Sequence, residues 1–413
     1  MQAAAARGNV RTGGLAVLGA ALAVSATLWY VQPIASGRAY ELAFETSLVL
    51  FLVWLAWSTA GRWSQSVRAL GTVAAIGSVW SAAHVLDVDG DAEVVRVYRS
   101  LFSALDRNDN PYTCDCIPHV TEHGLRLGNF NYPPGEIWPY RAASWIAGQW
   151  DVVVFVLTLL ALGAAALALL WWANVPELRR SLVAFSPFVV FWELRTNVAT
   201  TLVVVAAITA ILLVGARDPR PWHRPALWAL FGLGILTKFV VVPLFAVWWW
   251  SSTARRATEA RAVHDRAVRR RVWRASSVDL VAPLGTALLL CIPFGVVSIV
   301  RETVLFNLSL DRRDDVATFY PNVLSGPLTW AGLDGWYPVV AVALLGGVIL
   351  AAPLLPQLTA MLVATTTFLL VAPTPEPQYV PVVVLLLVTA LADRERRTAL
   401  DAPVHGPPIP AAT

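Results

Sequence analysis

Apolar segments long enough to cross a lipid bilayer recur along this chain. Asp151–Trp172 is one example of 22 residues, and it contains almost no polar residues, as does the shorter Val339–Ala352. A transmembrane helix needs about 20 such residues. Overall, 57% of the 413 residues are hydrophobic and only 14% are charged, whereas soluble domains have roughly 45–50% and 25%. The apolar runs do not alternate in polarity as β-barrel strands do. The sequence therefore excludes a soluble fold and predicts a polytopic, all-α membrane protein.

Hydropathy and the distribution of arginines together predict about twelve transmembrane helices in the cell membrane, with both termini in the cytoplasm. The expected spans lie at about 14–33, 44–60, 68–86, 150–172, 179–192, 198–215, 225–237, 239–252, 277–299, 337–352, 355–371 and 379–392. The most basic segment, 253–276, is predicted as a cytoplasmic loop, and the polar segments 87–148 and 300–336 as outer loops. Residues 1–401 are expected to form one domain, and 402–413 a disordered tail.

The sequence lacks the common signatures of metal and nucleotide sites. Cys114, Cys116 and Cys291 are too few for a disulfide framework, and one Cys-Asp-Cys pair offers two ligands where a structural zinc needs four. Neither a Walker A loop nor a dinucleotide fingerprint occurs. We therefore predict no metal centre from these cysteines, no nucleic-acid partner and no ATP-driven transport by this chain alone.

A cluster of carboxylates follows the third predicted span. Four acidic residues lie within Asp87–Glu93. Carboxylates this close raise one another's pKa, which suits either a bound cation, such as Mg²⁺ or Mn²⁺, or a group that accepts a proton. A solvated helix cap explains the same residues, and the Gly and Glu positions do not match an EF-hand.

Two further segments carry polar groups beside predicted spans. Gly128–Gly135 contains two consecutive prolines among aromatic and amide side chains, which predicts a rigid re-entry into the membrane. Such side chains suit the hydroxyls and ring faces of a carbohydrate, and interfacial anchoring explains them equally well. Lys238, the only lysine, lies between two half-length apolar segments. A lysine there faces protein, water or an anion, as in discontinuous helices that frame binding sites, unless it snorkels to the interface.

The order of these motifs resembles that of the GT-C glycosyltransferases, and most closely glycosyltransferase family 87 and related polyprenyl-phosphate-mannose-dependent mannosyltransferases. The matching segments are the acidic loop, Val97–Tyr98, Asn110–Tyr112, Phe130–Pro134, Arg195–Asn197, Gly234–Phe239 and Ala317–Gly326. They cover about 90–330 of the chain. Against this family, 1–67 is an additional N-terminal helical hairpin.

The resemblance implies an inverting membrane enzyme. It would move a sugar, mannose or another hexose, from a polyprenyl-phosphate donor to a hydroxyl of a glycolipid, glycan or protein on the outer face. An acid of the first outer loop would be the general base, with Asp91 as first choice before Asp89 and Glu93. The residues that would bind the donor phosphate are Lys238, Arg195, Arg301, Arg312 and Arg313. Those that would bind sugar or acceptor are Tyr98, Asn131, Tyr132, Asn197, Asn322, Glu376, Gln378 and Tyr379.

Two other classes of function fit parts of the sequence. A secondary transporter or lipid flippase for polyprenyl-linked or other anionic substrates would also use a mid-chain lysine and broken helices. Such transporters usually contain inverted repeats, and this chain shows none. A structural or assembly subunit without catalysis is the third class.

Overall fold

The structure, a computed structural model, is mostly helical, which is compatible with the predicted all-α class. It describes residues 93–121, 124–176, 178, 199–263, 266–305, 328, 331–371 and 379–401. The four predicted spans at about 14–33, 44–60, 68–86 and 179–192 lie outside these residues, as do the segments 1–67 and 402–413.

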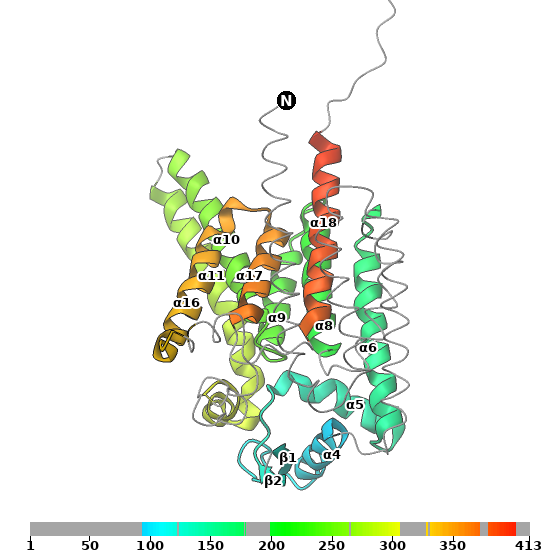
Figure 1. The fold of residues 1–413 in the computed structure, drawn as a ribbon. Coiled ribbons are helices and arrows are strands. Elements are labelled where there is room, and N and C mark those ends of the chain that lie inside the picture. The colour runs from blue at the N-terminus through cyan, green and yellow to red at the C-terminus, as the bar shows by residue number, and fades with distance from the viewer. Residues whose placement is uncertain are drawn as a thin grey trace, which may run out of the picture.

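Each of the eight predicted spans within the described residues contains a helix of the bundle (Figure 1). These helices are α6 (Val152–Trp172), α8 (Ala199–Gly215), α9 (His223–Ile235), α10 (Val241–Val263), α11 (Arg266–Cys291), α16 (Tyr337–Ala351), α17 (Gln357–Val371) and α18 (Val380–Asp401). Short helical turns follow some of them: η3 (Ile292–Phe294), α12 (Val296–Ile299), η4 (Val300–Leu305), η6 (Asp334–Trp336) and η7 (Ala352–Leu354).

Three segments of the bundle are long and apolar enough to cross a membrane. They are Val152–Trp172, Arg266–Phe294 and Tyr337–Leu354. Helices α8 and α17 are also apolar but shorter. The described residues thus support a helical membrane protein, while the number of twelve spans stays a prediction.

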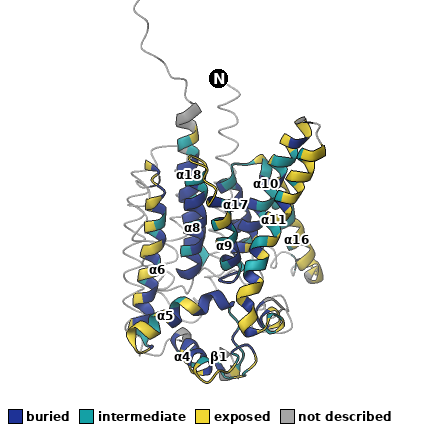
Figure 2. Cartoon of the chain, turned by 180° about the vertical axis from the view of Figure 1, so that it is seen from behind, coloured by how far each residue is buried: buried dark blue, intermediate teal, exposed yellow. Residues whose placement is uncertain are grey.

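The core of the bundle lies around α8 and α18, which are buried along most of their length (Figure 2). Side chains of α6, α9, α10 and α17 complete this apolar cluster. Helices α9 and α11 approach closely at Gly232, which has no side chain. A Cβ on Gly232 would lie 2.7 Å from the Pro283 carbonyl oxygen. The outer faces of α6, α11 and α16 carry exposed apolar side chains such as Leu157, Leu289 and Val342. Contiguous apolar surface of this kind suits contact with lipid.

A small cap closes one end of the bundle (Figure 1). It consists of α4 (Glu93–Asp106), β1 (Ile117–Thr121), β2 (Gly124–Gly128), η2 (Pro134–Glu136) and α5 (Ile137–Ala147). The two strands pair antiparallel, with Ile117 opposite Gly128. A disulfide joins Cys114 to Cys116 just before β1. The sequence analysis anticipated neither the hairpin nor the disulfide.

Aromatic packing holds the cap together and against α6. The rings of Tyr98 and Tyr140 have centroids 4.7 Å apart, and Phe130 and Trp150 pack around them. The Trp150 indole Nε1 donates a hydrogen bond of 3.1 Å to the Val95 carbonyl oxygen. Buried indole and phenol groups combine a large apolar surface with a polar tip, which suits the core of a small cap.

Helices α10 and α11 both extend into the basic segment 253–276, which the sequence predicts as a cytoplasmic loop. Helix α10 continues to Val263 and α11 begins at Arg266. Alanine, arginine and glutamate favour helices, so a charged, solvated segment need not be irregular. This basic hairpin and the last turns of α18 lie at the end of the bundle opposite the cap (Figure 1).

A buried carboxylate ties three helices together near the basic hairpin. Asp279 on α11 is fully buried. It accepts from Arg224 Nε of α9 at 2.6 Å, pairs with Arg256 Nη1 of α10 at 2.7 Å and accepts from Trp228 Nε1 at 2.8 Å. A buried charge with this many partners is costly to disturb, because removing it leaves the arginines without their counter-charge.

We expect Asp279→Asn to lower the free energy of unfolding by about 3 kcal/mol, in the range seen when one partner of a buried ion pair is removed. Thermal unfolding in detergent measures the effect. Asp218→Asn is the matched control, since Asp218 pairs with Arg220 and both side chains are about 60% exposed. That change should cost less than about 1 kcal/mol. Equal effects of the two substitutions would contradict the role of Asp279.

Candidate functional site

The chain breaks its helical course at Lys238, as predicted. Helix α9 ends at Ile235 and α10 begins at Val241. The turn between them is closed by hydrogen bonds to the Gly234 carbonyl oxygen from the Thr237 N–H at 2.9 Å and the Lys238 N–H at 3.2 Å. The Lys238 side chain is only 4% exposed. It is therefore enclosed by protein rather than extended to solvent.

The cap docks on this break through the segment with two prolines. The Gly135 N–H donates a hydrogen bond of 2.8 Å to the Leu236 carbonyl oxygen. A Cβ on Gly135 would lie 2.7 Å from that same oxygen, so only glycine permits the approach. The prolines fix the backbone on the N-terminal side without needing hydrogen bonds from their nitrogens. This docking brings the neighbouring residues of the cap to Lys238.

The ring of Tyr132 contacts the lysine, and Glu136 lies close enough for the charge of the lysine to act on its carboxyl group. The Lys238 Nζ lies 4.0 Å from the centroid of the Tyr132 ring, a cation–π geometry that strengthens when water is excluded. Glu136 is fully buried, and neither carboxylate oxygen has a hydrogen-bond partner within the described residues. Burial raises the pKa of Glu136 to about 7, while the charge of Lys238 and the nearby Thr201 hydroxyl oppose the rise.

Thr201 extends the cluster to a third element. It lies in the first turn of α8 and is fully buried, four positions after Asn197. Cap, α8 and the α9–α10 break thus converge on one polar cluster of Tyr132, Glu136, Thr201 and Lys238. A buried cation beside a carboxyl group that can exist in either protonation state is an arrangement suited to binding an anion.

The structure brings some of the predicted site residues together and separates others. Lys238 and Tyr132 are in contact, and the adjacent Asn131 has a buried Oδ1 without a hydrogen-bond partner in the described part of the chain. Tyr98 instead lies fully buried in the aromatic packing of the cap. Arg301 is 64% exposed and pairs with Glu302 at 3.2 Å.

The remaining predicted residues lie at element ends or are not described. Glu93 is the first residue of α4, and Tyr379 directly precedes α18 and packs against the bundle core. The residues outside the described part are Asp89, Asp91, Arg195, Asn197, Arg312, Arg313, Asn322, Glu376 and Gln378. Within the part that is described, no three His, Cys, Asp or Glu side chains come together as a metal site.

Sequence reasoning overlooked Glu136 and Thr201 as site residues. A signal for Glu136 exists in the sequence, because a single lysine near the membrane needs a counter-charge and Glu136 directly follows the two-proline turn. Thr201 carries no such signal. No known protein family, curated protein or solved structure matches this chain. The candidate site is therefore argued from its own geometry.

The raised pKa of Glu136 predicts a pH-dependent stability. The folded state holds the proton up to about pH 7, whereas the unfolded chain releases it near 4.5. Stability from this group is thus full below pH 4.5 and is lost as the pH rises toward 7. We expect the free energy of unfolding of the wild type to fall, relative to that of Glu136→Gln, by at most about 3 kcal/mol across this pH window. Its unfolding midpoint should fall with it.

Thermal unfolding in detergent between pH 5 and 8 provides the measurement. Glu259→Gln, an exposed position on α10, is the control and should follow the wild-type profile. Parallel profiles for wild type and Glu136→Gln would show that the Glu136 carboxyl group is not protonated by burial.

Proposed function

We propose that this protein is a membrane glycosyltransferase that transfers mannose or another hexose from a polyprenyl-phosphate donor to an acceptor hydroxyl on the outer face. One observation carries the proposal: the only lysine of the chain is buried in a helix break and contacts Tyr132, next to Glu136, in the cap. A cation, an aromatic ring and a carboxyl group are the groups that a phosphate leaving group and a sugar require.

The lysine would act on the leaving group. As the bond between the sugar C1 and the phosphate oxygen breaks, the bonding electrons go to that oxygen and its negative charge grows. A preorganised ammonium group in a site without bulk water stabilises this charge far more than water would. Because the pKa of Glu136 is about 7, the carboxyl group is partly protonated at neutral pH. A donor phosphate can then replace it as the partner of Lys238.

The acceptor would need a base on the opposite side of the sugar ring. In an inverting displacement the base takes the proton of the acceptor hydroxyl while its oxygen attacks C1. The acidic segment remains the proposed source, with Asp91 first and Asp89 and Glu93 next. Glu93 begins α4 in the cap, at the same end of the bundle as Lys238. Tyr132 and Asn131 are proposed to contact the sugar.

The charge distribution supports an outward-facing site. The basic hairpin lies at the opposite end of the bundle from the cap (Figure 1). Arginine-rich segments are retained in the cytoplasm, so the cap would face outward. The Cys114–Cys116 disulfide in the cap fits an oxidising exterior.

Lys238→Met should reduce sugar transfer by about 10²–10³-fold, as the loss of one group that stabilises transition-state charge does elsewhere. Lys238→Arg keeps the charge and should retain more activity. Transfer from a radiolabelled polyprenyl-phosphate sugar in membranes is the measurement. Arg261→Met, an exposed cation of α10, is the control and should be fully active. Wild-type activity in Lys238→Met would remove the lysine from the mechanism.

Single substitutions Asp89→Asn, Asp91→Asn and Glu93→Gln test the base in the same assay. We expect Asp91→Asn to lower transfer most, by about 10²–10⁴-fold, the usual contribution of a general base. Undiminished transfer in all three variants would disprove the assignment. Absence of transfer by the wild type with every donor tested, together with movement of a polyprenyl-linked lipid across vesicles, would favour the flippase.

A further inference from the structure

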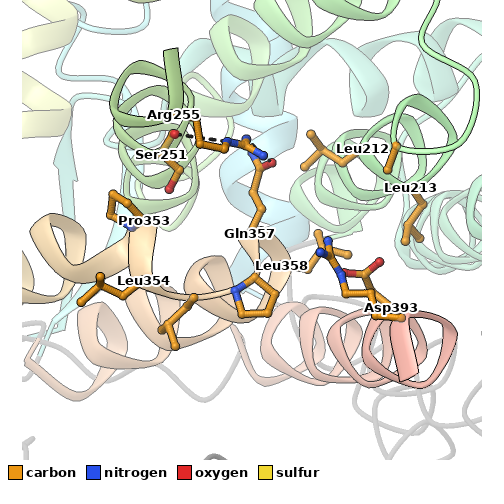
Figure 3. Close-up of a pocket in the computed structure, with 13 residues that line it drawn as sticks. Leu212, Leu213, Ser251, Arg255, Pro353, Leu354, Gln357, Leu358 and Asp393 are labelled. Carbon is orange, nitrogen blue, oxygen red and sulfur yellow. Dashed lines mark hydrogen bonds and ion pairs between the residues drawn. The ribbon is translucent and has the colours of Figure 1, made fainter. Parts of the chain in front are cut away.

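A cavity lies away from the candidate site, at the end of the bundle that carries the basic hairpin. It has a volume of about 370 Å³, is partly open, and is lined by residues of α8, α10, η7, α17 and α18 (Figure 3). Its polar wall contains Ser251, Arg255 and Gln357, and its apolar wall is mostly leucine, including Leu212, Leu354 and Leu358. Neither the sequence motifs nor the proposed transfer reaction uses this cavity.

Arg255 is held at the cavity by two neutral oxygen atoms. Its Nε donates to the Ser251 carbonyl oxygen at 3.3 Å, and its Nη2 donates to Gln357 Oε1 at 3.2 Å. No carboxylate pairs with Arg255 among the residues that the structure describes. The guanidinium group therefore keeps its full charge and further N–H donors for a ligand.

Two buried donors beside Arg255 have no hydrogen-bond partner among the described residues. The Ser251 hydroxyl belongs to a residue only 4% exposed and makes no hydrogen bond in the described part of the chain. The Gln357 Nε2 is also buried and makes none there. Buried donors are normally satisfied, so an unpaired pair that lines a cavity indicates a missing acceptor.

Asp393, the acidic residue of the cavity wall, does not supply the missing acceptor for these donors. Asp393 lies away from Ser251 and Arg255 in the cavity (Figure 3). Its two oxygens accept from Arg396 and Arg397, each at 2.8 Å. Since two arginines already balance the charge of this carboxylate, the electrostatic potential around Arg255 stays positive.

We propose that the cavity binds a phosphate group through Arg255, Ser251 Oγ and Gln357 Nε2. Guanidinium, hydroxyl and amide donors match the oxygens of a phosphate ester. Basic pockets between membrane helices on the cytoplasmic side bind anionic lipid headgroups. The leucine wall beside Arg255 can pack against acyl chains, so it favours a phosphate that carries them. The source is then an anionic phospholipid, and a free phosphate ion is the alternative source of the same chemistry.

Native mass spectrometry of the full-length protein in detergent tests the proposal, with phosphatidylglycerol and phosphatidylcholine as probes. Wild type should retain phosphatidylglycerol in preference to phosphatidylcholine. Arg255→Gln should weaken that retention about tenfold, a free-energy change of about 1.4 kcal/mol. Arg261→Gln, which removes an exposed arginine from the same helix, is the matched control and should bind as the wild type does.

A second readout distinguishes the two sources of phosphate. Stabilisation of wild type, but not of Arg255→Gln, by millimolar inorganic phosphate, without any preference among lipids, would support the site with a soluble ligand. Ser251→Ala keeps the test valid if Arg255→Gln does not fold, because the hydroxyl it removes makes no hydrogen bond within the part of the chain that the structure describes. Equal binding of every probe by wild type and both cavity variants, or equal loss in Arg261→Gln, would overturn the proposal.

Discussion

The burial of one ammonium group organises the end of the bundle that carries the candidate site. A charge removed from water must find partners inside the protein. Lys238 finds them in the ring of Tyr132, 4.0 Å away, and in Glu136. Both belong to a segment about a hundred positions earlier in the chain, so the cap must dock on the α9–α10 break. The contact between the Gly135 N–H and the Leu236 carbonyl oxygen fixes the distance of that docking.

Two of the buried carboxylates in the described part of the chain, Asp279 and Glu136, show how structural and functional charges can differ. Asp279 has two arginines and an indole as partners, which leaves it little capacity for anything else. Glu136 has one cation nearby and no hydrogen bond to its oxygens within the described residues. A fully paired charge fastens helices together, whereas an incompletely paired one can change partner or protonation state at low cost. By this criterion Glu136 is a better candidate than Asp279 for a functional site.

Hydropathy predicted the bundle well because lipid exposure acts on every residue of a span. The break at Lys238 was also predictable, since a lone lysine cannot continue an apolar helix into lipid. The short β-hairpin was not, because strand formation depends on neighbours that the sequence does not reveal. Charge alone placed the segment 253–276 as a cytoplasmic loop and did not predict that α10 and α11 extend into it. Glu136 was missed because its role arises from a long-range contact.

The two polar sites share helices but not ligands. Helix α10 begins beside Lys238 and carries Arg255 fourteen residues after Val241, which corresponds to about 21 Å along a helix axis. That distance is most of the roughly 30 Å thickness of a bilayer core. A phosphate held by Arg255 therefore cannot also lie at Lys238, and the cavity is not an extension of the donor site. Each end of the bundle thus presents its own cation, a buried one at the cap and an exposed one at the basic hairpin.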